Sequence, residues 1–498
     1  MEGHGAMRHN SLNDNFRSYI LVAFLILSFT MQGQTLKGGI SFKMLRQIEN
    51  AQPKSPTLKG LQHSMASNNI DSLALNASRL EQTNPHFMYE TVKQNIQNQY
   101  ESGRCWCFTG LNVLRGAFAK AHQDTMTVEY SRAYLYFYVQ ILPEYPGAAY
   151  LYFYDQLEKS NLMLQGCIDT AYKPMDDTRV TFFFKKPLHD GGTFCGIIDL
   201  IRKYGLVPAS AQQETYQANH NKKITQLLNR KLRMFGLELR RMVHEGQTET
   251  SITKRKTEML GIVYNMLSLA VGTPVKHFKY AFKNAQGQPV TQEREYTPMT
   301  FYKATIGELN YDDYIMVMND PRRPYYKTYK VLYARHLYDG HDWKYLNLPM
   351  KDIETIAVAS IKDGIKMYSS YDSEKQRNNS TAYCDLDNYN YDSLFGTSFQ
   401  MSKADRISTY DSGSTHAMAL TAVDLDAQEN PIRWKAENTF GPGFGVNGGY
   451  VIMSNRWFEA YMFRLVALKK YAPTSLVKAY EQEPTGVYPE DPLFGEDR

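Results

Sequence analysis

The feature that most constrains the fold of this 498-residue chain is the segment that begins at Cys105. After Ser102-Gly103-Arg104, apolar residues recur with helical spacing at Phe108, Leu111, Leu114, Ala117 and Phe118. This pattern predicts a helix with one buried face, and Cys105 lies in its first turn. Unpaired N–H groups and the positive end of the helix dipole stabilise a thiolate there. Cys105 is therefore either a reactive thiol or a small buried apolar residue.

The composition narrows the class of protein without naming a partner. Hydrophobic residues make up 43% and charged residues 21%, which is typical of a folded globular chain and excludes disorder as its main state. The net charge of +5 is too small for this length to indicate nucleic acid or an acidic membrane. Five cysteines are too few for a disulfide framework. The sequence contains no Cys-x-x-Cys pair, so it does not predict a structural metal site.

The N-terminus has the pattern of a secretory signal. Arg8 and Arg17 precede a mostly apolar run over residues 19–31. Such a run reaches only about 20 Å as a helix, less than the roughly 30 Å hydrocarbon core of a bilayer. We therefore expect a signal peptide over residues 1–34, export to the periplasm or the medium, and no membrane span in the mature chain. If the run is instead a buried helix or an uncleaved anchor, that expectation fails and the protein can be cytoplasmic.

The sequence around Cys105 resembles a known active site. The segment from Asn98 to Trp106 resembles the active-site helix entry of papain-like cysteine peptidases, most closely the bleomycin hydrolase and aminopeptidase C family. In that family a glutamine six residues before the cysteine donates to the oxyanion, and Gln99 holds this position. The resemblance further implies that His416 in GSTHAMALTAV is the base and that Asn438 in RWKAENTFGPGF orients it.

The surroundings of His416 and Asn438 agree with that assignment on physical grounds. His416 precedes the apolar run 417–423, which predicts a buried strand. Asn438 ends another short segment, just before the glycine-rich stretch 441–449. That stretch reads as a turn between strands and not as a dinucleotide loop, because no helical pattern with an acidic partner follows it. Two strands can thus present a base and its orienting group to a thiol on a helix.

The resemblance covers roughly residues 90–498 and implies an α+β fold. The core is expected to be a two-lobed papain-like cysteine peptidase, with a large helical insertion and a C-terminal arm. We expect the following organisation: signal peptide 1–34, N-terminal extension 35–90, helical lobe with the catalytic cysteine 91–185, insertion 186–395, β lobe with the histidine and asparagine 396–472, and C-terminal arm 473–498.

The insertion contains one strongly periodic segment, residues 222–244. Its apolar positions are 224, 227, 228, 232, 235, 239 and 243, with basic residues between them. This spacing predicts a packed helix with a cationic outer face. In the resembled family such insertions assemble a homohexamer around a central channel, with the active sites facing inward. The basic face can equally be an ordinary solvated surface.

The end of the chain resembles the family's C-terminal arm. In that family the arm lies in the cleft and its terminal carboxylate anchors the α-amine of the substrate. This chain departs from the pattern, because it ends in Glu496, Asp497 and Arg498 where relatives end in small apolar residues. The two acidic side chains can add affinity for the amine, and Arg498 can hinder it. Thr439-Phe440-Gly441 also stands where the family has Ser-Trp-Gly, and we expect Phe440 to cover the triad.

The sequence therefore predicts a cysteine aminopeptidase that cleaves peptides with a free N-terminus through a thioester, without a cofactor. Three alternatives remain: a catalytically silent oligomeric shell, a nucleic-acid-binding shell, and a papain-like endopeptidase. Export would separate the protein from nucleic acid, so nucleic acid is not an expected partner. His189, His336 and His341 are expected to be structural or surface groups, and Cys107 a packing residue.

Overall fold

The computed structural model describes residues 38–52, 55–79, 84–124, 147–282, 289 and 291–494. The chain divides into two compact units, residues 1–73 and 74–498. The smaller unit contains helices α2 (Phe42–Asn50) and α3 (Pro56–Ser67), and α4 (Ile70–Ala74) spans the boundary. The Ser41 and Ser55 hydroxyls accept hydrogen bonds from backbone N–H groups in the first turns of α2 and α3, which explains where these helices begin.

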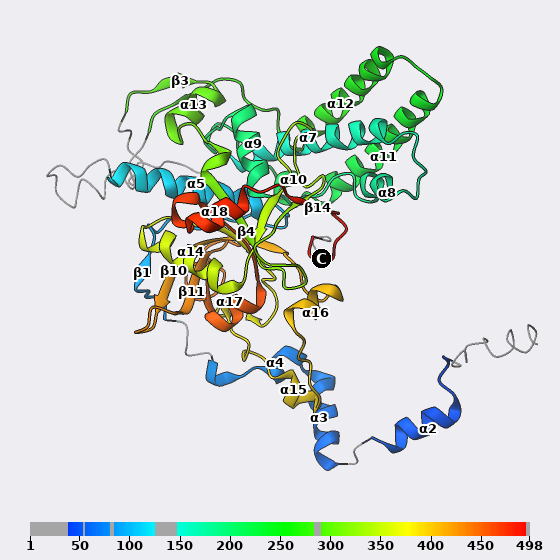
Figure 1. Ribbon diagram of the computed structural model, residues 1–498, viewed down its shortest axis with the longest axis vertical. Coiled ribbons are helices and arrows are strands. Elements are labelled where there is room, and N and C mark those ends of the chain that lie inside the picture. Colours follow the sequence, from blue (N-terminus) through cyan, green and yellow to red (C-terminus); the bar gives the residue numbers. More distant parts are fainter. Residues whose placement is uncertain are drawn as a thin grey trace, which may run out of the picture. The chain divides into compact units, whose positions relative to one another are not determined.

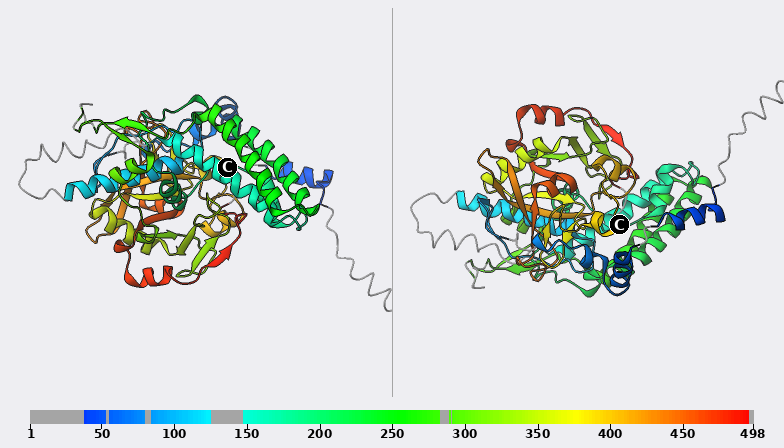
Figure 2. Two further views of the ribbon diagram at one scale, coloured as in Figure 1. Left: turned by 90° about the horizontal axis from the view of Figure 1, so that it is seen from above. Right: turned by 90° about the horizontal axis from the view of Figure 1, so that it is seen from below.

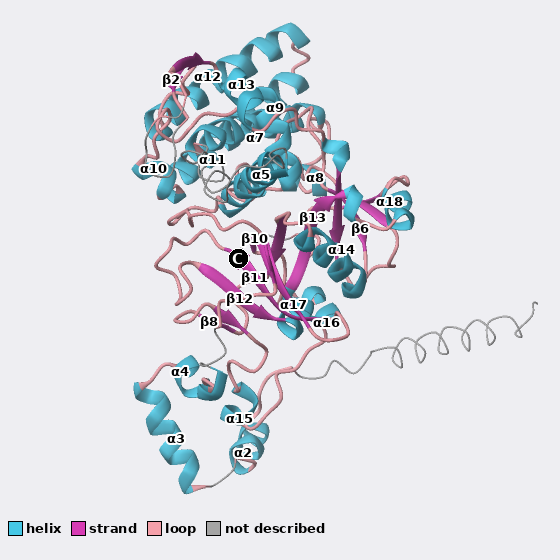
Figure 3. Ribbon diagram, turned by 90° about the vertical axis from the view of Figure 1, so that its left-hand side faces the viewer, coloured by secondary structure: helices cyan, strands magenta, loops and turns pink. Residues whose placement is uncertain are grey.

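The larger unit is built on a twelve-stranded sheet (Figures 1 and 3). In the order of the sheet its strands are β14 (Thr485–Val487), β5 (Thr328–Val331), β6 (Lys344–Asn347), β4 (Tyr314–Met318), β13 (Met462–Leu468), β7 (Met367–Tyr371), β10 (His416–Leu425), β11 (Pro431–Glu437), β12 (Tyr450–Ser454), β9 (Tyr383–Cys384) and β8 (Arg377–Asn378), with β1 (Tyr89–Glu90) paired to β10. A separate hairpin joins β2 (Phe278–Tyr280) to β3 (Arg294–Tyr296).

Helices cover this sheet and form a second layer beside it. Their bounds are α5 (Cys105–Asp124), α7 (Ala148–Asp169), α8 (Thr178–Lys185), α9 (Phe194–Tyr204), α10 (Tyr216–Asn219), α11 (Lys222–His244), α12 (Glu249–Val271), α13 (Pro298–Thr305), α14 (Met350–Lys362), α15 (Tyr391–Phe395), α16 (Lys403–Ser408), α17 (Asn455–Tyr461) and α18 (Thr474–Tyr480). Short 3-10 turns lie at Ala77–Arg79, Tyr311–Asp313 and Lys469–Tyr471. None of the helices described here is long and apolar enough to cross a membrane.

Among the described residues, the buried apolar side chains form two cores. The larger core joins α5 and α9 to the sheet, with Trp106 and Phe194 among its fully buried rings. The smaller core lies among α7, α8, α11 and α12, where Leu232 and Phe235 of α11 are buried. Figure 2 shows the long green helices of this second layer beside the part of the molecule that holds the strands. The helical layer can therefore form one wall of a site whose other wall is the sheet.

The strongest periodic patterns in the sequence are confirmed. Helix α5 begins at Cys105, α11 spans residues 222–244, and the apolar run after His416 is strand β10. The stretch 441–449 connects β11 to β12, as a turn between strands. One part of the prediction for α11 is wrong: Leu227 is 48% exposed, and Met242 is buried instead.

The strand pairings place the limits of the N-terminal extension and of the insertion at other residues than expected. Strand β1 lies in the predicted N-terminal extension, yet Tyr89 pairs with Val423 of β10, and the larger unit begins at Ala74. Strands β4 to β9 lie in the predicted insertion but belong to the same sheet as β10. Within residues 186–395, the helices that contribute to the separate smaller core, together with α7 and α8, are α10, α11 and α12.

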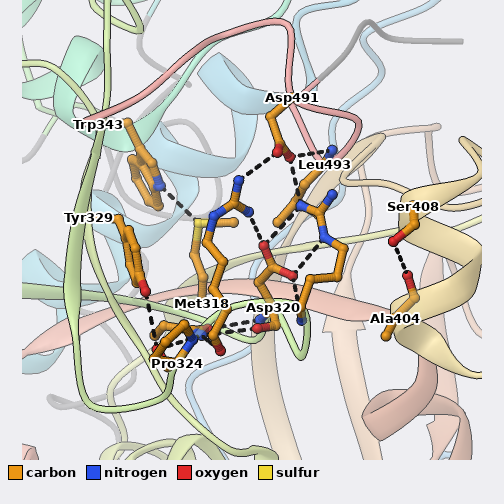
Figure 4. A network of polar contacts seen from close by, with 12 residues as sticks. Met318, Asp320, Pro324, Tyr329, Trp343, Ala404, Ser408, Asp491 and Leu493 are labelled. Atoms are coloured by element: carbon orange, nitrogen blue, oxygen red, sulfur yellow. Dashed lines mark hydrogen bonds and ion pairs between the residues drawn. The ribbon is translucent and has the colours of Figure 1, made fainter. Parts of the chain in front are cut away.

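The C-terminal segment is fixed to the sheet by a strand and by an ion-pair cluster. Strand β14 pairs in parallel with β5. Four residues after this strand, the Asp491 carboxylate accepts hydrogen bonds from Arg322, at 2.6 Å, and from Arg323. Both guanidinium groups also contact the fully buried Asp320 (Figure 4). We call these four residues the Asp491 clamp, and Leu493 just beyond it is buried.

A buried ion pair fixes the end of β11. The Lys366 ammonium lies 2.6 Å from the Glu437 carboxylate, both side chains are almost completely buried, and Lys366 also donates to Gln94 at 2.9 Å. Glu437 directly precedes Asn438. A buried charge without its partner is strongly destabilising, whereas replacing both partners by apolar groups need not be.

We therefore expect Lys366→Met to lower the free energy of unfolding by about 3 to 5 kcal/mol, because Glu437 loses its counter-ion. The double variant Lys366→Met, Glu437→Leu should recover most of this loss. Chemical denaturation with urea measures both. If the single variant lost less than about 1 kcal/mol, the Lys366–Glu437 ion pair would not contribute to stability as expected.

Candidate active site

The loop that leads into α5 is held by a buried arginine. The Arg104 side chain is fully buried and donates to Ser102 Oγ at 2.9 Å, to Glu214 at 2.8 Å and to Asn219 Oδ1 at 2.8 Å. Charge-assisted bonds of this kind are stronger and more directional than neutral ones. Because Arg104 directly precedes Cys105, these bonds fix where α5 starts and where the thiol lies.

Helix α5 is tied to the strand that carries the histidine. The Thr109 hydroxyl donates to the Ala417 carbonyl at 3.0 Å, and both residues are buried. Thr109 lies one helical turn beyond Cys105 on the same face, and Ala417 follows His416. Cys105 and His416 consequently line the same cavity.

The structure also joins His416 to Asn438. The Nε2 atom of His416 lies 2.7 Å from Asn438 Oδ1, and this oxygen also accepts the Thr439 backbone N–H at 2.8 Å. The Phe440 ring lies against the imidazole with its centroid at 4.6 Å, and the Arg377 guanidinium lies over Phe440. This contact agrees, for the His416 ring, with the expectation that Phe440 covers the triad. An amide oxygen at Nε2 leaves Nδ1 for the thiol side of the ring.

Burial controls the charge of the histidine. It lowers the pKa of His416 to about 4, the Asn438 hydrogen bond opposes this shift, and the Arg377 charge adds to it. An isolated imidazolium is therefore unfavourable here. A thiolate at Cys105 would offset this cost, since a transfer of the thiol proton to the imidazole leaves the net charge of the cavity unchanged.

Gln99 is buried beside this site, and its amide is held at both ends. Its Nε2 donates to the Ser102 carbonyl at 2.6 Å, and its Oε1 accepts from the Thr439 hydroxyl. Its backbone N–H also donates to the Thr439 carbonyl at 2.8 Å. An amide nitrogen carries two N–H groups, and the second one is not used by any residue in the described ranges. Gln99 is not among the described residues that line the cavity.

The cavity that contains Cys105 and His416 has a volume of about 490 Å³. Three residues of the C-terminal segment line it: Pro489, Glu490 and Phe494. Four basic residues also line it, namely Lys185, Lys186, Arg335 and Arg464. Glu490 had no predicted role. Its position depends on how the C-terminal segment folds back, and no local pattern in the sequence reports that.

A buried polar network supports the wall of the cavity behind Trp106. The Asp155 carboxylate binds His336 Nδ1 and, at 2.9 Å, the Lys159 ammonium. Although burial opposes it, these two partners hold the pKa of Asp155 down to about 2, and burial lowers the pKa of His336. His336 Nε2 accepts the Thr193 N–H at 3.1 Å, so both ring nitrogens are used. His336 is structural, as expected. In the sequence, only the four-residue spacing of Asp155 and Lys159 on one helix could have indicated this network.

Several predicted residues lie apart from this site. The tip residues Glu496, Asp497 and Arg498, and the signal region 1–34, lie outside the described residues. Cys107, Cys167, Cys195 and Cys384 are buried, and burial raises the pKa of the Cys195 and Cys384 thiols to about 12. His341 is half exposed and pairs with Asp199 at 2.7 Å. Within the described ranges no three His, Cys, Asp or Glu side chains form a metal-binding group.

The burial of His416 leads to a titration prediction. In Cys105→Ala no thiolate can form, so we expect the pKa of His416 to stay at about 4, because burial disfavours the imidazolium. Asn438→Ala in the same background should lower it further. NMR titration of ¹³C-labelled histidine, with His416→Gln to assign the signal, measures this. A titration midpoint of His416 at or above pH 6.5 would contradict an imidazole that burial keeps neutral.

Comparisons with known proteins agree with this geometry. The chain matches a family model described as "Peptidase C1-like family" over residues 39–142 and 147–494. It is 31% identical to Aminopeptidase C of Lactobacillus delbrueckii subsp. lactis, over 91% of this chain and 98% of that protein. It is 33% identical to Aminopeptidase G of the same organism, over 82% and 88%.

A solved structure gives the same result. The crystal structure of PepW from Lactobacillus rhamnosis HN001 superposes with a TM-score of 0.84 at 31% identity, and covers 92% of this chain and 99% of that one. The match therefore extends over the helical layer as well as the sheet. The chain belongs to the Peptidase C1-like family, and with it to the cysteine-type peptidases related to aminopeptidase C.

Proposed function

We propose that this protein is a cysteine aminopeptidase that releases residues from the free N-terminus of peptides. The observation that carries the proposal is that Cys105 and His416 line one cavity together with Pro489, Glu490 and Phe494. A nucleophile and a base in a cavity lined in part by the chain's own C-terminal segment suit a short substrate end better than a long polypeptide. The names of the relatives, Aminopeptidase C and Aminopeptidase G, support the same activity.

In the proposed acylation step, Cys105 gives its proton to His416, and the thiolate attacks the carbonyl carbon of the scissile bond. The carbonyl oxygen takes the negative charge. We assign its stabilisation to the second amide N–H of Gln99, which requires a rotation of that amide toward the cavity, and to a backbone N–H at the start of α5. The C–N bond then breaks, the leaving amine takes the proton from His416, and a thioester remains on Cys105.

In the proposed deacylation step, water attacks the thioester while His416 accepts its proton. The C–S bond breaks, the carboxylic acid product leaves, and the thiol of Cys105 is regenerated. Asn438 keeps the imidazole in one tautomer and at one ring angle through its bond to Nε2. Phe440 shields that bond from water.

The C-terminal arm is proposed to restrict the cleft. The Asp491 clamp fixes the backbone next to the three lining residues, which supports this role. The tip residues Glu496, Asp497 and Arg498 remain candidates for contact with the substrate amine. An endopeptidase is the second candidate, and it requires an arm that leaves the cavity.

Two further parts of the proposal concern assembly and export. Large apolar side chains are exposed on α11 and α12, at Leu227, Met234, Leu237, Ile262 and Leu269. Such a surface supports self-association of this chain, and we propose a homohexamer. The molecular mass measured by analytical ultracentrifugation would test this. The apolar run 19–31 supports export with removal of residues 1–34, and N-terminal sequencing of the secreted form would test that.

The direct test of the activity compares an alanyl fluorogenic amide with its N-acetylated twin. We expect the free amine substrate to be cleaved at least a hundred times faster. Cys105→Ala should be inactive, because the nucleophile is lost. Gln99→Ala should retain activity reduced by about 10² to 10³ in kcat, the usual effect of losing one oxyanion donor.

The two competing functions predict other outcomes. Equal cleavage of both substrates would indicate an endopeptidase. No cleavage of either, with Cys105 still reactive toward iodoacetamide, would indicate a silent shell.

A further inference from the structure

The cavity that contains Cys105 and His416 has an excess of positive charge. Four of its described lining side chains are basic, namely Lys185, Lys186, Arg335 and Arg464, and one, Glu490, is acidic. The histidines in the lining are neutral at about pH 7, because burial lowers their pKa. A cavity with this balance attracts anionic groups and repels cationic ones.

Three of the four basic side chains belong to one wall of the cavity. Lys185 is the last residue of α8, and Lys186 follows it. The Tyr333 ring packs against the Phe182 ring of α8, with 5.7 Å between the centroids. Arg335, two residues after Tyr333, therefore lies on the segment that packs beside the end of α8. We call Lys185, Lys186 and Arg335 the basic wall.

The backbone of the basic wall is held by α11. Arg233 of that helix donates to the Phe184 carbonyl at 2.8 Å and to the Lys185 carbonyl at 2.7 Å. The Asn229 side chain accepts the Leu188 N–H at 2.6 Å and donates to the Leu188 carbonyl at 3.1 Å. A ligand that binds the two lysines consequently does not have to order the chain that carries them.

The basic wall has few counter-ions of its own. No acidic side chain in the described ranges forms an ion pair with Lys185 or Lys186. The Arg335 Nε lies 3.9 Å from the Asp342 carboxylate, too far for a hydrogen bond, and it is buried without a hydrogen-bond partner among the described residues. Glu490 makes no hydrogen bond to any described residue either, so it does not bind the wall directly. Buried donors are nearly always paired, and a carboxylate that arrives with the substrate would pair these.

The basic wall is connected to the nucleophile. His336 directly follows Arg335, and its ring lies against the Trp106 ring with 4.7 Å between the centroids. Trp106 directly follows Cys105. A substrate whose carbonyl carbon is at Cys105 therefore brings its nearby side chains close to the wall.

We propose that the basic wall binds an acidic side chain of the substrate, so that the enzyme prefers peptides with Asp or Glu close to the free N-terminus. This inference rests on the proposed aminopeptidase function and names its substrate class. The free amine of such a peptide is a cation, which the excess positive charge of the cavity repels. A side-chain carboxylate in the same peptide offsets that repulsion.

The test compares matched peptides that have Glu or Gln at the first, second or third position and alanine elsewhere. Glu and Gln are close in size, so the ratio of their kcat/KM values reports the charge. At about pH 7 the Glu side chain is ionised, and we expect a ratio of about tenfold or more in favour of Glu at one of these positions. High salt should lower this ratio, because it screens the attraction.

Variants assign the preference to the basic wall. The combined variant Lys185→Gln, Lys186→Gln, Arg335→Gln should reduce the ratio to below about threefold, because the positive charges are removed. The double variant Lys185→Gln, Lys186→Gln leaves the partly buried Arg335 in place and should lower the ratio by at least about threefold. Because both peptides are cleaved by the same sample, a partial loss of folded enzyme cancels in the ratio.

A matched control removes two other lysines of the helical layer. Lys222 and Lys223 are exposed in the first turn of α11 and are not among the described lining residues. The double variant Lys222→Gln, Lys223→Gln should keep the wild-type ratio.

Three results would overturn the inference. The first is a wild-type ratio below about threefold at all three positions. The second is a wild-type ratio that persists in the combined variant, which would place the carboxylate elsewhere in the cavity. The third is a ratio that appears only after truncation before Glu496, which would assign the wall to the acidic tip of the chain. Failure of the aminopeptidase proposal is distinguishable, because mass spectrometry would then show no shortening of the Gln peptides from their N-termini.

Discussion

The contact between α5 and β10 is the constraint on which the rest of the site depends. A nucleophile on a helix and a base on a strand can act together only if helix and strand pack in one register. The Thr109 hydroxyl bonded to the Ala417 carbonyl sets that register, one turn from Cys105 and one residue from His416. Apolar packing around this bond, with Trp106 and Phe194 in the same core, excludes water and holds the two elements together.

Each partner in this contact is anchored separately by buried polar groups. Arg104 fixes the start of α5 through Glu214 and Asn219, which come from the segment just before α11. The pair of Lys366 and Glu437 fixes the end of β11, next to Asn438. Apolar packing is tolerant of small shifts, whereas hydrogen-bonded charges are directional. These buried ionic groups lie next to Cys105 and Asn438, and they restrict the movement of the two segments that carry the proposed nucleophile and the proposed orienting group.

The sequence predicts those parts of the fold that depend on neighbours along the chain. The periodicity after Cys105 and over residues 222–244 follows from helical geometry, and the run after His416 follows from a strand buried on both faces. The resemblance to the family rests largely on the segment from Asn98 to Trp106, in which Gln99 and Cys105 are only six residues apart. These features are local, so a reader of the sequence can derive them.

The remaining features depend on pairings between distant segments. No local pattern shows that β4 to β9 join the sheet of β10, since a strand can pair with any other strand of suitable length. The position of Glu490 depends on how Asp491 meets Arg322 and Arg323, which are far away in the sequence. A carboxylate in this segment is ordinary in a sequence, and only its burial without a hydrogen-bond partner among the described residues distinguishes it.

The most direct test of a thiol nucleophile in a cavity selective for free amines is covalent labelling by an alanyl chloromethyl ketone, analysed by peptide mass spectrometry. The account predicts one adduct, on Cys105, formed much faster by the free-amine reagent than by its N-acetylated form. Equal rates for both reagents, or an adduct on a cysteine other than Cys105, would contradict it.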